Sequence, residues 1–130
     1  MTTPIIVVDD EPMIRHILSF AMDGLDHPVL PASDAEEALA LMRANSPALV
    51  VCDVRLPGMN GVQLADAIKR ERRWHNTAIV LISAFREPAI HVADRFVSKP
   101  FHVDRMAAVA RDLLVQRSIS TPPSPEILPC

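Results

Sequence analysis

Three uninterrupted apolar runs stand out along the chain, at residues 5–8, 49–52 and 78–82. Runs of this length that are apolar at every position are typical of strands covered on both faces, as in a parallel sheet. Two shorter runs, at residues 29–30 and 96–97, are expected to add two more strands. The hydrophobic pattern therefore predicts a five-stranded sheet.

Between these runs, apolar residues recur at intervals of three and four positions, which predicts helices. Pro12 suits the first turn of one helix, and Ser33 to Glu36 has the spacing of a capping box that opens another. We expect helices at about residues 12–22, from 33 to a stop at Pro47, at 60–72 and at 103–115. Strands that alternate with helices imply right-handed crossovers and a doubly wound α/β domain with a parallel sheet.

Polar residues end the predicted strands. Asp9 and Asp10 follow the first run, and Asp53 follows the central one. Ser83 and Lys99 follow the last two. Because the carboxyl ends of parallel strands lie on one side of the sheet, we expect these five residues to converge where such sheets bind ligands.

Length and composition describe one ordinary domain. At 130 residues the chain is long enough for a single core, which we assign to residues 1–117. Residues 118–130 contain four prolines and three serines and are expected to form a disordered tail. The formal charge of −3 gives no basic bias toward nucleic acid. No apolar run approaches the roughly 18 residues of a membrane span, so we expect no membrane insertion and a cytoplasmic protein.

The predicted cleft brings together three carboxylates, which repel one another unless protons or a cation neutralise them. Mg²⁺ prefers oxygen ligands and is usually held by one or two carboxylates together with phosphate oxygens, so the cleft favours Mg²⁺ and a phosphoryl group. Lys99 adds a positive charge and Ser83 a hydroxyl, which suits a transferring phosphoryl group. We expect Asp53 to be the nucleophile, since the glycines after it would let the backbone approach a ligand.

Four blocks of the sequence resemble the receiver domain of two-component response regulators. They are Val7–Glu11, Val51–Gly61, Ile82–Ala84 and Phe96–Phe101, and they occur in that order. The resemblance covers about residues 4–116. It implies a flavodoxin-like sheet with the strand order 2-1-3-4-5.

The resemblance also implies a role for each residue of the cleft. Asp53 would be the phosphoacceptor. Asp9 and Asp10 would bind Mg²⁺ together with Asp53 and the backbone carbonyl of Arg55.

Two further roles concern the phosphoryl group. Ser83 and Lys99 would contact it. Phe96 matches an aromatic position whose ring turns inward when the hydroxyl residue moves, so Ser83 and Phe96 would form the switch. The Lys99–Pro100 bond matches one that is cis in the family.

One segment departs from the family's pattern. Lys99 lies only sixteen positions after Ser83, a shorter spacing than the family usually has. The fourth helix of the fold is therefore expected to be short or irregular. Residues 87–92 could form two turns that start at Pro88, or no stable helix at all.

The resemblance implies a signalling switch and not an enzyme. Asp53 would receive a phosphoryl group from a histidine kinase or a histidine phosphotransfer protein, and the domain would catalyse only its own phosphorylation and dephosphorylation. Because only the tail follows residue 117, output is expected to occur through contact with a downstream protein.

Two other functions fit parts of the pattern. A small Mg²⁺-dependent phosphatase of the haloacid-dehalogenase type also uses an Asp nucleophile on a doubly wound sheet, but its motif has a second acid where this chain has Arg55. The other is a receiver-like module that binds partners without phosphorylation. The intact Asp53, Ser83 and Lys99 argue against it.

Overall fold

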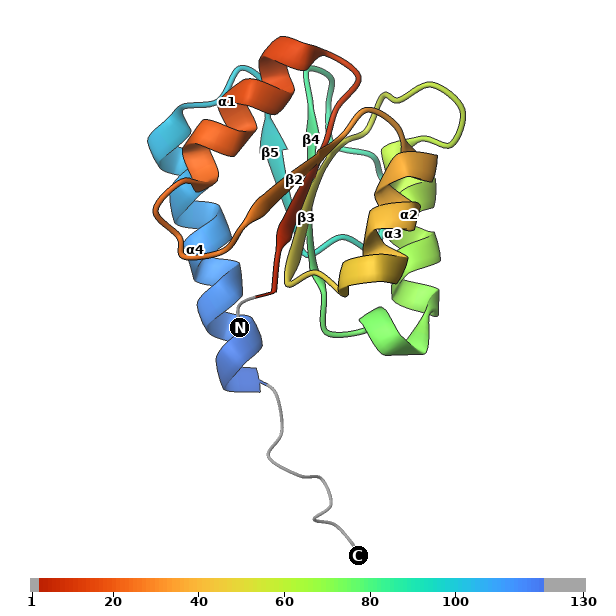
Figure 1. Cartoon of the computed structure of the whole chain (residues 1–130). Coiled ribbons are helices and arrows are strands. Elements are labelled where there is room, and N and C mark those ends of the chain that lie inside the picture. Colours follow the sequence, from red (N-terminus) through yellow and green to blue (C-terminus); the bar gives the residue numbers. More distant parts are fainter. Residues whose placement is uncertain (1–2, 121–130) are drawn as a thin grey trace, which may run out of the picture.

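The strands form one parallel sheet in the order β2-β1-β3-β4-β5 (Figure 1). The computed structural model describes residues 3–120. The strands are β1 (Ile5–Val8), β2 (Val29–Ala32), β3 (Leu49–Asp53), β4 (Ala78–Ser83) and β5 (Arg95–Ser98). All neighbouring strands run parallel. The predicted five-stranded sheet and its order are confirmed.

Helices cover both faces of this sheet. Helices α1 and α4 lie on one face, and α2 and α3 lie on the other (Figure 1). Their bounds are α1 (Pro12–Met22), α2 (Ala35–Asn45), α3 (Gly61–Arg70) and α4 (Val103–Ser120), with a 3₁₀ turn, η1, at Arg72–Trp74. Within residues 3–120, no helix is both long and apolar enough to cross a membrane.

Burial on both faces explains why the strands are uninterrupted apolar runs. In β1, Ile5 and Val7 pack into the core beneath α1 and α4, whereas Ile6 and Val8 pack into the core beneath α2 and α3. All four side chains are fully buried. Successive side chains of a strand point to opposite faces, and each buried aliphatic side chain contributes roughly 1.5–3 kcal/mol.

The start of α2 differs from the prediction by one residue. Asp34, not Ser33, is the N-cap, and its carboxylate accepts a hydrogen bond from the backbone N–H of Glu37 at 2.8 Å. The Glu37 carboxylate accepts from the N–H and the hydroxyl of Ser33 at 2.8 and 3.0 Å. The capping box predicted for Ser33 and Glu36 was therefore wrong.

Helix α3 begins with a complete capping box. The Asn60 side chain accepts from the N–H of Gln63, and the Gln63 side chain accepts from the N–H of Asn60, both at 2.9 Å. These bonds satisfy two of the free N–H groups at the helix start. They fix the end of the loop that follows Asp53.

The crossover from β4 to β5 has no helix. Residues 84–94 consist of bends and irregular chain, so of the two alternatives left by the sequence, the structure takes the one without a helix. The last helix, α4, is longer than predicted and continues to Ser120. Its end includes the first three residues of the predicted tail, and residues 121–130 lie outside the described part of the chain.

Candidate functional site

The carboxyl ends of the strands border a cleft of about 300 Å³. Asp9 follows β1, Asp53 ends β3, Ser83 ends β4 and Lys99 follows β5. The parallel sheet therefore brings these residues to one edge, as the strand pattern predicts. The cleft is lined by Asp10, Glu11, Asp53, Arg55, Ala84, Phe85 and Lys99.

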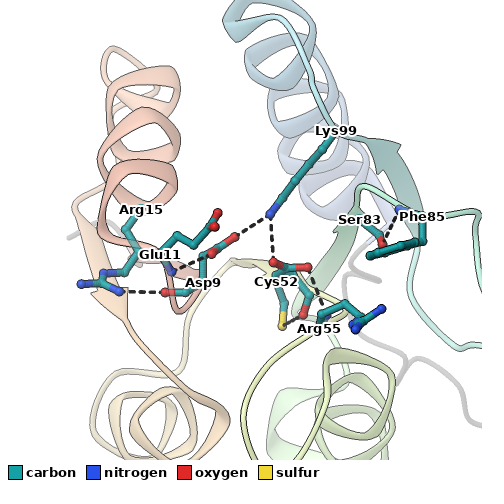
Figure 2. A network of polar contacts seen from close by, with 9 residues as sticks. Asp9, Glu11, Arg15, Cys52, Arg55, Ser83, Phe85 and Lys99 are labelled. Atoms are coloured by element: carbon teal, nitrogen blue, oxygen red, sulfur yellow. Dashed lines mark hydrogen bonds and ion pairs between the residues drawn. The ribbon is translucent and has the colours of Figure 1, made fainter.

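Lys99 joins two buried carboxylates (Figure 2). Its Nζ lies 2.9 Å from Asp53 Oδ2 and 3.1 Å from Asp9 Oδ2. Asp9 is completely buried, and Asp53 is 6% exposed. Burial lowers the pKa of Lys99, but the two carboxylates outweigh burial, so this pKa is raised overall. Lys99 is thus a charged ammonium at neutral pH.

Asp9 is fixed by its own backbone and by α1 (Figure 2). The N–H of Glu11 donates to Asp9 Oδ1 at 2.9 Å, and the Arg15 guanidinium donates to the Asp9 backbone carbonyl at 2.8 Å. Burial, aided by the charge of Asp53, raises the pKa of Asp9 to about 6, against the hydrogen bonds from Glu11 and Lys99. The site without a cation therefore disfavours the charge on Asp9.

The end of β3 holds Asp53 rigidly. The N–H of Arg55 donates to Asp53 Oδ1 at 3.1 Å, on the side opposite the bond from Lys99. The N–H of Gly61 donates to the Val54 carbonyl at 2.9 Å, and a Cβ on Gly61 would lie 2.3 Å from the Asp53 backbone oxygen. Gly61 is required because α3 starts against the backbone of Asp53, and not to make room for a ligand as the sequence suggested.

Asp9, Asp10 and Asp53 are arranged to hold a metal ion. One carboxylate oxygen from each lies within 4.8 Å of the others. Three carboxylates with the single ammonium of Lys99 leave two net negative charges, which one divalent cation balances. The donors are all oxygen, as hard cations prefer. The raised pKa of Asp9 fits such an ion, since a cation would offset the cost of charging this buried group.

The hydroxyl side of the cleft leads into the crossover. Ser83 is buried, and its Oγ accepts a hydrogen bond from the N–H of Phe85 at 3.0 Å (Figure 2). The Arg55 guanidinium carbon lies 4.6 Å from the centre of the Phe85 ring, so these two side chains stack beside the cleft. Phe96 is half-buried against the core beneath α2 and α3. The switching role of Ser83 and Phe96 stays a prediction.

Two residues that the sequence patterns did not single out support the site. Arg15 binds the Asp9 carbonyl, and the Cys52 thiol donates to the Asp53 carbonyl at 3.2 Å. Burial raises the pKa of the Cys52 thiol, which therefore remains protonated and can donate. Bonds to backbone carbonyls leave no trace in sequence. The position of Arg15 near the acids could nevertheless have been predicted, because Arg15 lies one helical turn after Glu11 in the helix that follows Asp9 and Asp10.

Comparisons with known proteins agree with this geometry. Residues 5–111 match the family model for the response regulator receiver domain. A protein of Synechocystis sp. named response regulator Rre1 is 31% identical, over 93% of this chain and 56% of its own length. A protein of Porphyra purpurea named probable transcriptional regulator ycf27 is 34% identical, over 85% of this chain and 46% of its own length. The chain thus spans about half the length of the curated relatives it matches.

Solved structures show the same fold. The receiver domain of NtrX from Brucella abortus is 33% identical, with a TM-score of 0.74, over 85% of this chain and 98% of that one. The chemotaxis protein CheY4 of Vibrio cholerae is 22% identical, with a TM-score of 0.79, over 87% of this chain and 99% of that one. This chain therefore has the same fold as these proteins.

Proposed function

Because the chain belongs to the receiver domain family of two-component response regulators, we propose that it is a phosphorylation-dependent switch whose phosphoacceptor is Asp53. The observation that carries this proposal is the contact of Lys99 with two buried carboxylates, at 2.9 Å from Asp53 and 3.1 Å from Asp9. A carboxylate beside a fixed ammonium and a cluster of acids is equipped to become an acyl phosphate.

The phosphoryl donor is a phosphohistidine of a histidine kinase or a histidine phosphotransfer protein. A carboxylate oxygen of Asp53 forms the new O–P bond while the N–P bond of the donor breaks, and the imidazole nitrogen keeps the electron pair. Lys99 offsets the negative charge on the transferring oxygens, and the Ser83 hydroxyl donates to one of them. Ser83 must first exchange its contact with the N–H of Phe85 for this one.

We assign the metal to Mg²⁺, with Asp9, Asp10, Asp53 and the backbone carbonyl of Arg55 as its protein ligands. When bound, Mg²⁺ supplies charge neutralisation at the transferring phosphoryl oxygens. Asp9 and Asp53 are held by the N–H groups of Glu11 and Arg55, so their carboxylates need little reorganisation to bind the ion.

The module acts as a switch, and the reactions it promotes are its own phosphorylation and dephosphorylation. Its output is contact with a downstream protein, and its cytoplasmic location stays a prediction. A phosphatase of the haloacid-dehalogenase type is disfavoured, because the second acid of that motif is replaced by Arg55, whose guanidinium lies over Phe85. A receiver-like module that binds partners without phosphorylation is also disfavoured, because the contact of Lys99 with both acids would play no part in such binding.

Labelling with a small phosphodonor tests the acceptor. The wild type with Mg²⁺ should gain one phosphoryl group, and Asp53→Asn should gain none while keeping its circular dichroism spectrum. Asp66→Asn is the matched control, because Asp66 is a half-buried acid on α3, outside the cleft, that pairs with Arg70. Labelling that survives in Asp53→Asn would place the nucleophile elsewhere. Wild-type protein that takes up no label and still binds partners would favour the module without phosphorylation.

A further inference from the structure

Arg15 joins the start of α1 to the end of β1 (Figure 2). Its guanidinium donates from an Nη atom to the backbone carbonyl of Asp9 at 2.8 Å. Its own N–H donates to the Glu11 carbonyl at 3.1 Å, which places Arg15 in the first turn of the helix. The N-cap of α1, Glu11, makes no side-chain capping bond. The bond from Arg15 therefore helps to fix how α1 leaves the sheet, directly after Asp9 and Asp10.

The acceptor of this bond is a carbonyl, although three acids are close in the sequence. Asp9, Asp10 and Glu11 precede Arg15 by four to six positions. In the described part of the chain, Arg15 forms no ion pair with any of them. A guanidinium binds a carboxylate more strongly than a neutral carbonyl, often through two parallel bonds. Such a pair with Asp10 would occupy oxygen atoms that a metal ion needs, so the observed contact leaves this ligand open.

The bond also acts on Asp10, through the peptide group that joins the two acids. A peptide group is planar, so fixing the Asp9 carbonyl fixes the direction of the Asp10 N–H and the position of the Asp10 Cα. Asp9 is held on its other side, where its N–H donates to the Ala32 carbonyl at 3.1 Å. Asp10 is exposed, and no group in the described part of the chain hydrogen bonds to its carboxylate. The reach of this carboxylate toward Asp53 thus depends on the peptide that Arg15 holds.

We propose that Arg15 is a positioning residue of the metal site. It holds the peptide between Asp9 and Asp10 so that the Asp10 carboxylate stays beside those of Asp9 and Asp53, where one oxygen of each lies within 4.8 Å of the others. Ligands that are already in place lose less conformational freedom when the ion binds. The inference rests on the proposed function, which assigns Mg²⁺ to this cluster, and it adds a residue that sets the affinity without touching the ion.

The charge of Arg15 would act in the opposite direction. A guanidinium close to the acids repels a cation, so removing this charge alone should strengthen Mg²⁺ binding. Removing the bond that positions Asp10 should weaken it, because residues that orient metal ligands typically account for roughly 10–100-fold in affinity. The direction of the change in affinity therefore distinguishes the positioning role from a simple charge effect.

Calorimetric titration of the full chain with Mg²⁺ tests this role. Arg15→Met keeps an apolar stem but removes the donors, and it should raise the Mg²⁺ dissociation constant by about tenfold. Arg15→Lys keeps a charged donor and should recover most of the affinity. Arg111→Ala is the matched control and should leave the affinity unchanged, because Arg111 is an exposed arginine of α4 outside the cleft lining. An unchanged or tighter dissociation constant in Arg15→Met, or an Arg15→Lys protein that binds as weakly as Arg15→Met, would overturn the proposal.

A second background tests the route through Asp10. Asp10→Ala removes the ligand that Arg15 positions, so adding Arg15→Met should then cost less than about twofold in Mg²⁺ affinity. The free energy of unfolding without Mg²⁺ measures any purely structural role of the Arg15 bond, and its decrease should be the same in both backgrounds. A loss of Mg²⁺ affinity that is also the same in both backgrounds would mean that Arg15 acts through the fold as a whole, which would overturn the proposal.

Titration with Mg²⁺ and labelling of Asp53 are separate measurements, so this inference and the proposed function can fail separately. A wild type that accepts a phosphoryl group and binds Mg²⁺, together with an Arg15→Met protein of unchanged affinity, would leave the switch intact and remove the role of Arg15. A wild type that binds no Mg²⁺ would overturn the metal assignment together with the role of Arg15.

Discussion

The two sides of the cleft are built differently. On the acid side, Asp9 and Asp53 are buried and share Lys99 through contacts of 3.1 and 2.9 Å. On the hydroxyl side, Ser83 is also buried, but the chain then leaves the sheet as a crossover without a helix. Phe85 and Ile90 on this crossover are 59% and 86% exposed.

We infer from this difference that the acid side carries out phosphoryl transfer and the hydroxyl side responds to it. Phosphoryl transfer needs groups already held in place, since reorganising them would add to the barrier. A response needs a segment with two arrangements of similar free energy. The crossover is anchored at both ends, where the N–H of Lys99 donates to the Ser83 carbonyl at 2.8 Å and the Asp94 side chain accepts from the N–H of Ile79 at 2.7 Å. Its middle is held mainly by the local His91–Glu87 contact at 2.6 Å.

The largest effect should come from Lys99. Lys99→Ala removes the cation that contacts both buried acids, so labelling by a small phosphodonor should slow by about 100-fold or more. Lys69 is the other lysine of the chain, and it binds Asp94 on the crossover at 3.3 Å. Lys69→Ala should change the rate only a few-fold. Equal losses of labelling rate in the two variants would contradict the assignment of the chemistry to the acid side of the cleft.

Asp9 should show a cost in stability that the metal removes. Its pKa is raised from 3.8 to about 6, so the folded state favours the protonated form, and the charged form destabilises the metal-free protein increasingly as pH rises through this window. Asp9→Asn should therefore raise metal-free stability at pH 8 by roughly 1–3 kcal/mol, with little difference below about pH 4. The same variant should weaken Mg²⁺ binding about tenfold or more, because the ion loses a charged ligand.

Asp10 provides the control for this prediction. Asp10 is exposed, so Asp10→Asn should weaken Mg²⁺ binding but leave metal-free stability nearly unchanged. Thermal unfolding at several pH values and magnesium titration measure both effects. An Asp9→Asn protein that is less stable than the wild type at pH 8 without metal would contradict the prediction. It would mean that the attraction between the Asp9 carboxylate and Lys99 outweighs the cost of burying the charge on Asp9.

The sheet and the set of residues at its edge were predictable from sequence because strands such as β3 are buried at every position. Such a strand cannot be mistaken for a surface segment, and the parallel arrangement then brings Asp53 and Lys99 together. The first residue of a helix was harder to predict where two neighbouring residues suit the N-cap equally well. Ser33 and Asp34 are both good caps followed three residues later by Glu, and in the structure Asp34 is the N-cap.

Features carried by the backbone were not predictable. The steric role of Gly61 depends on how closely α3 approaches the Asp53 carbonyl, and the bond from the Cys52 thiol depends on the position of the same carbonyl. The sequence could not decide the conformation of the crossover, because a short segment with Pro88 fits either two helical turns or irregular chain. The free-energy difference between the two depends on few contacts.

A smaller effect is expected where the two sides meet. The stacked Arg55 and Phe85 side chains lie beside the cleft and should shield the acyl phosphate from water, and Arg55 can also pair with its oxygens. Arg55→Ala with Phe85→Ala should shorten the phosphoryl lifetime several-fold. Ile90→Ala, an exposed apolar change on the crossover outside the cleft lining, should not. A lifetime that is unchanged or longer in the double variant would contradict this role.

The smallest effect, and the one that tests the response directly, is amide exchange in residues 84–94. Few of these N–H groups have acceptors in the described structure: that of Phe85 donates to Ser83 Oγ, that of Ala93 to His91 Nδ1 at 3.2 Å, and that of Asp94 to the Ile79 carbonyl at 2.9 Å. The segment should exchange quickly without a phosphoryl group. A phosphoryl mimic with Mg²⁺ should draw Ser83 and Phe96 toward the cleft and slow exchange along the crossover. Because this ordering costs conformational entropy, protection should be partial without a downstream partner. Helix α3, which starts in a complete capping box, should change little and provides the internal reference. Equal protection of residues 84–94 in both states would mean that the crossover is not the switch, and that the signal leaves through another surface.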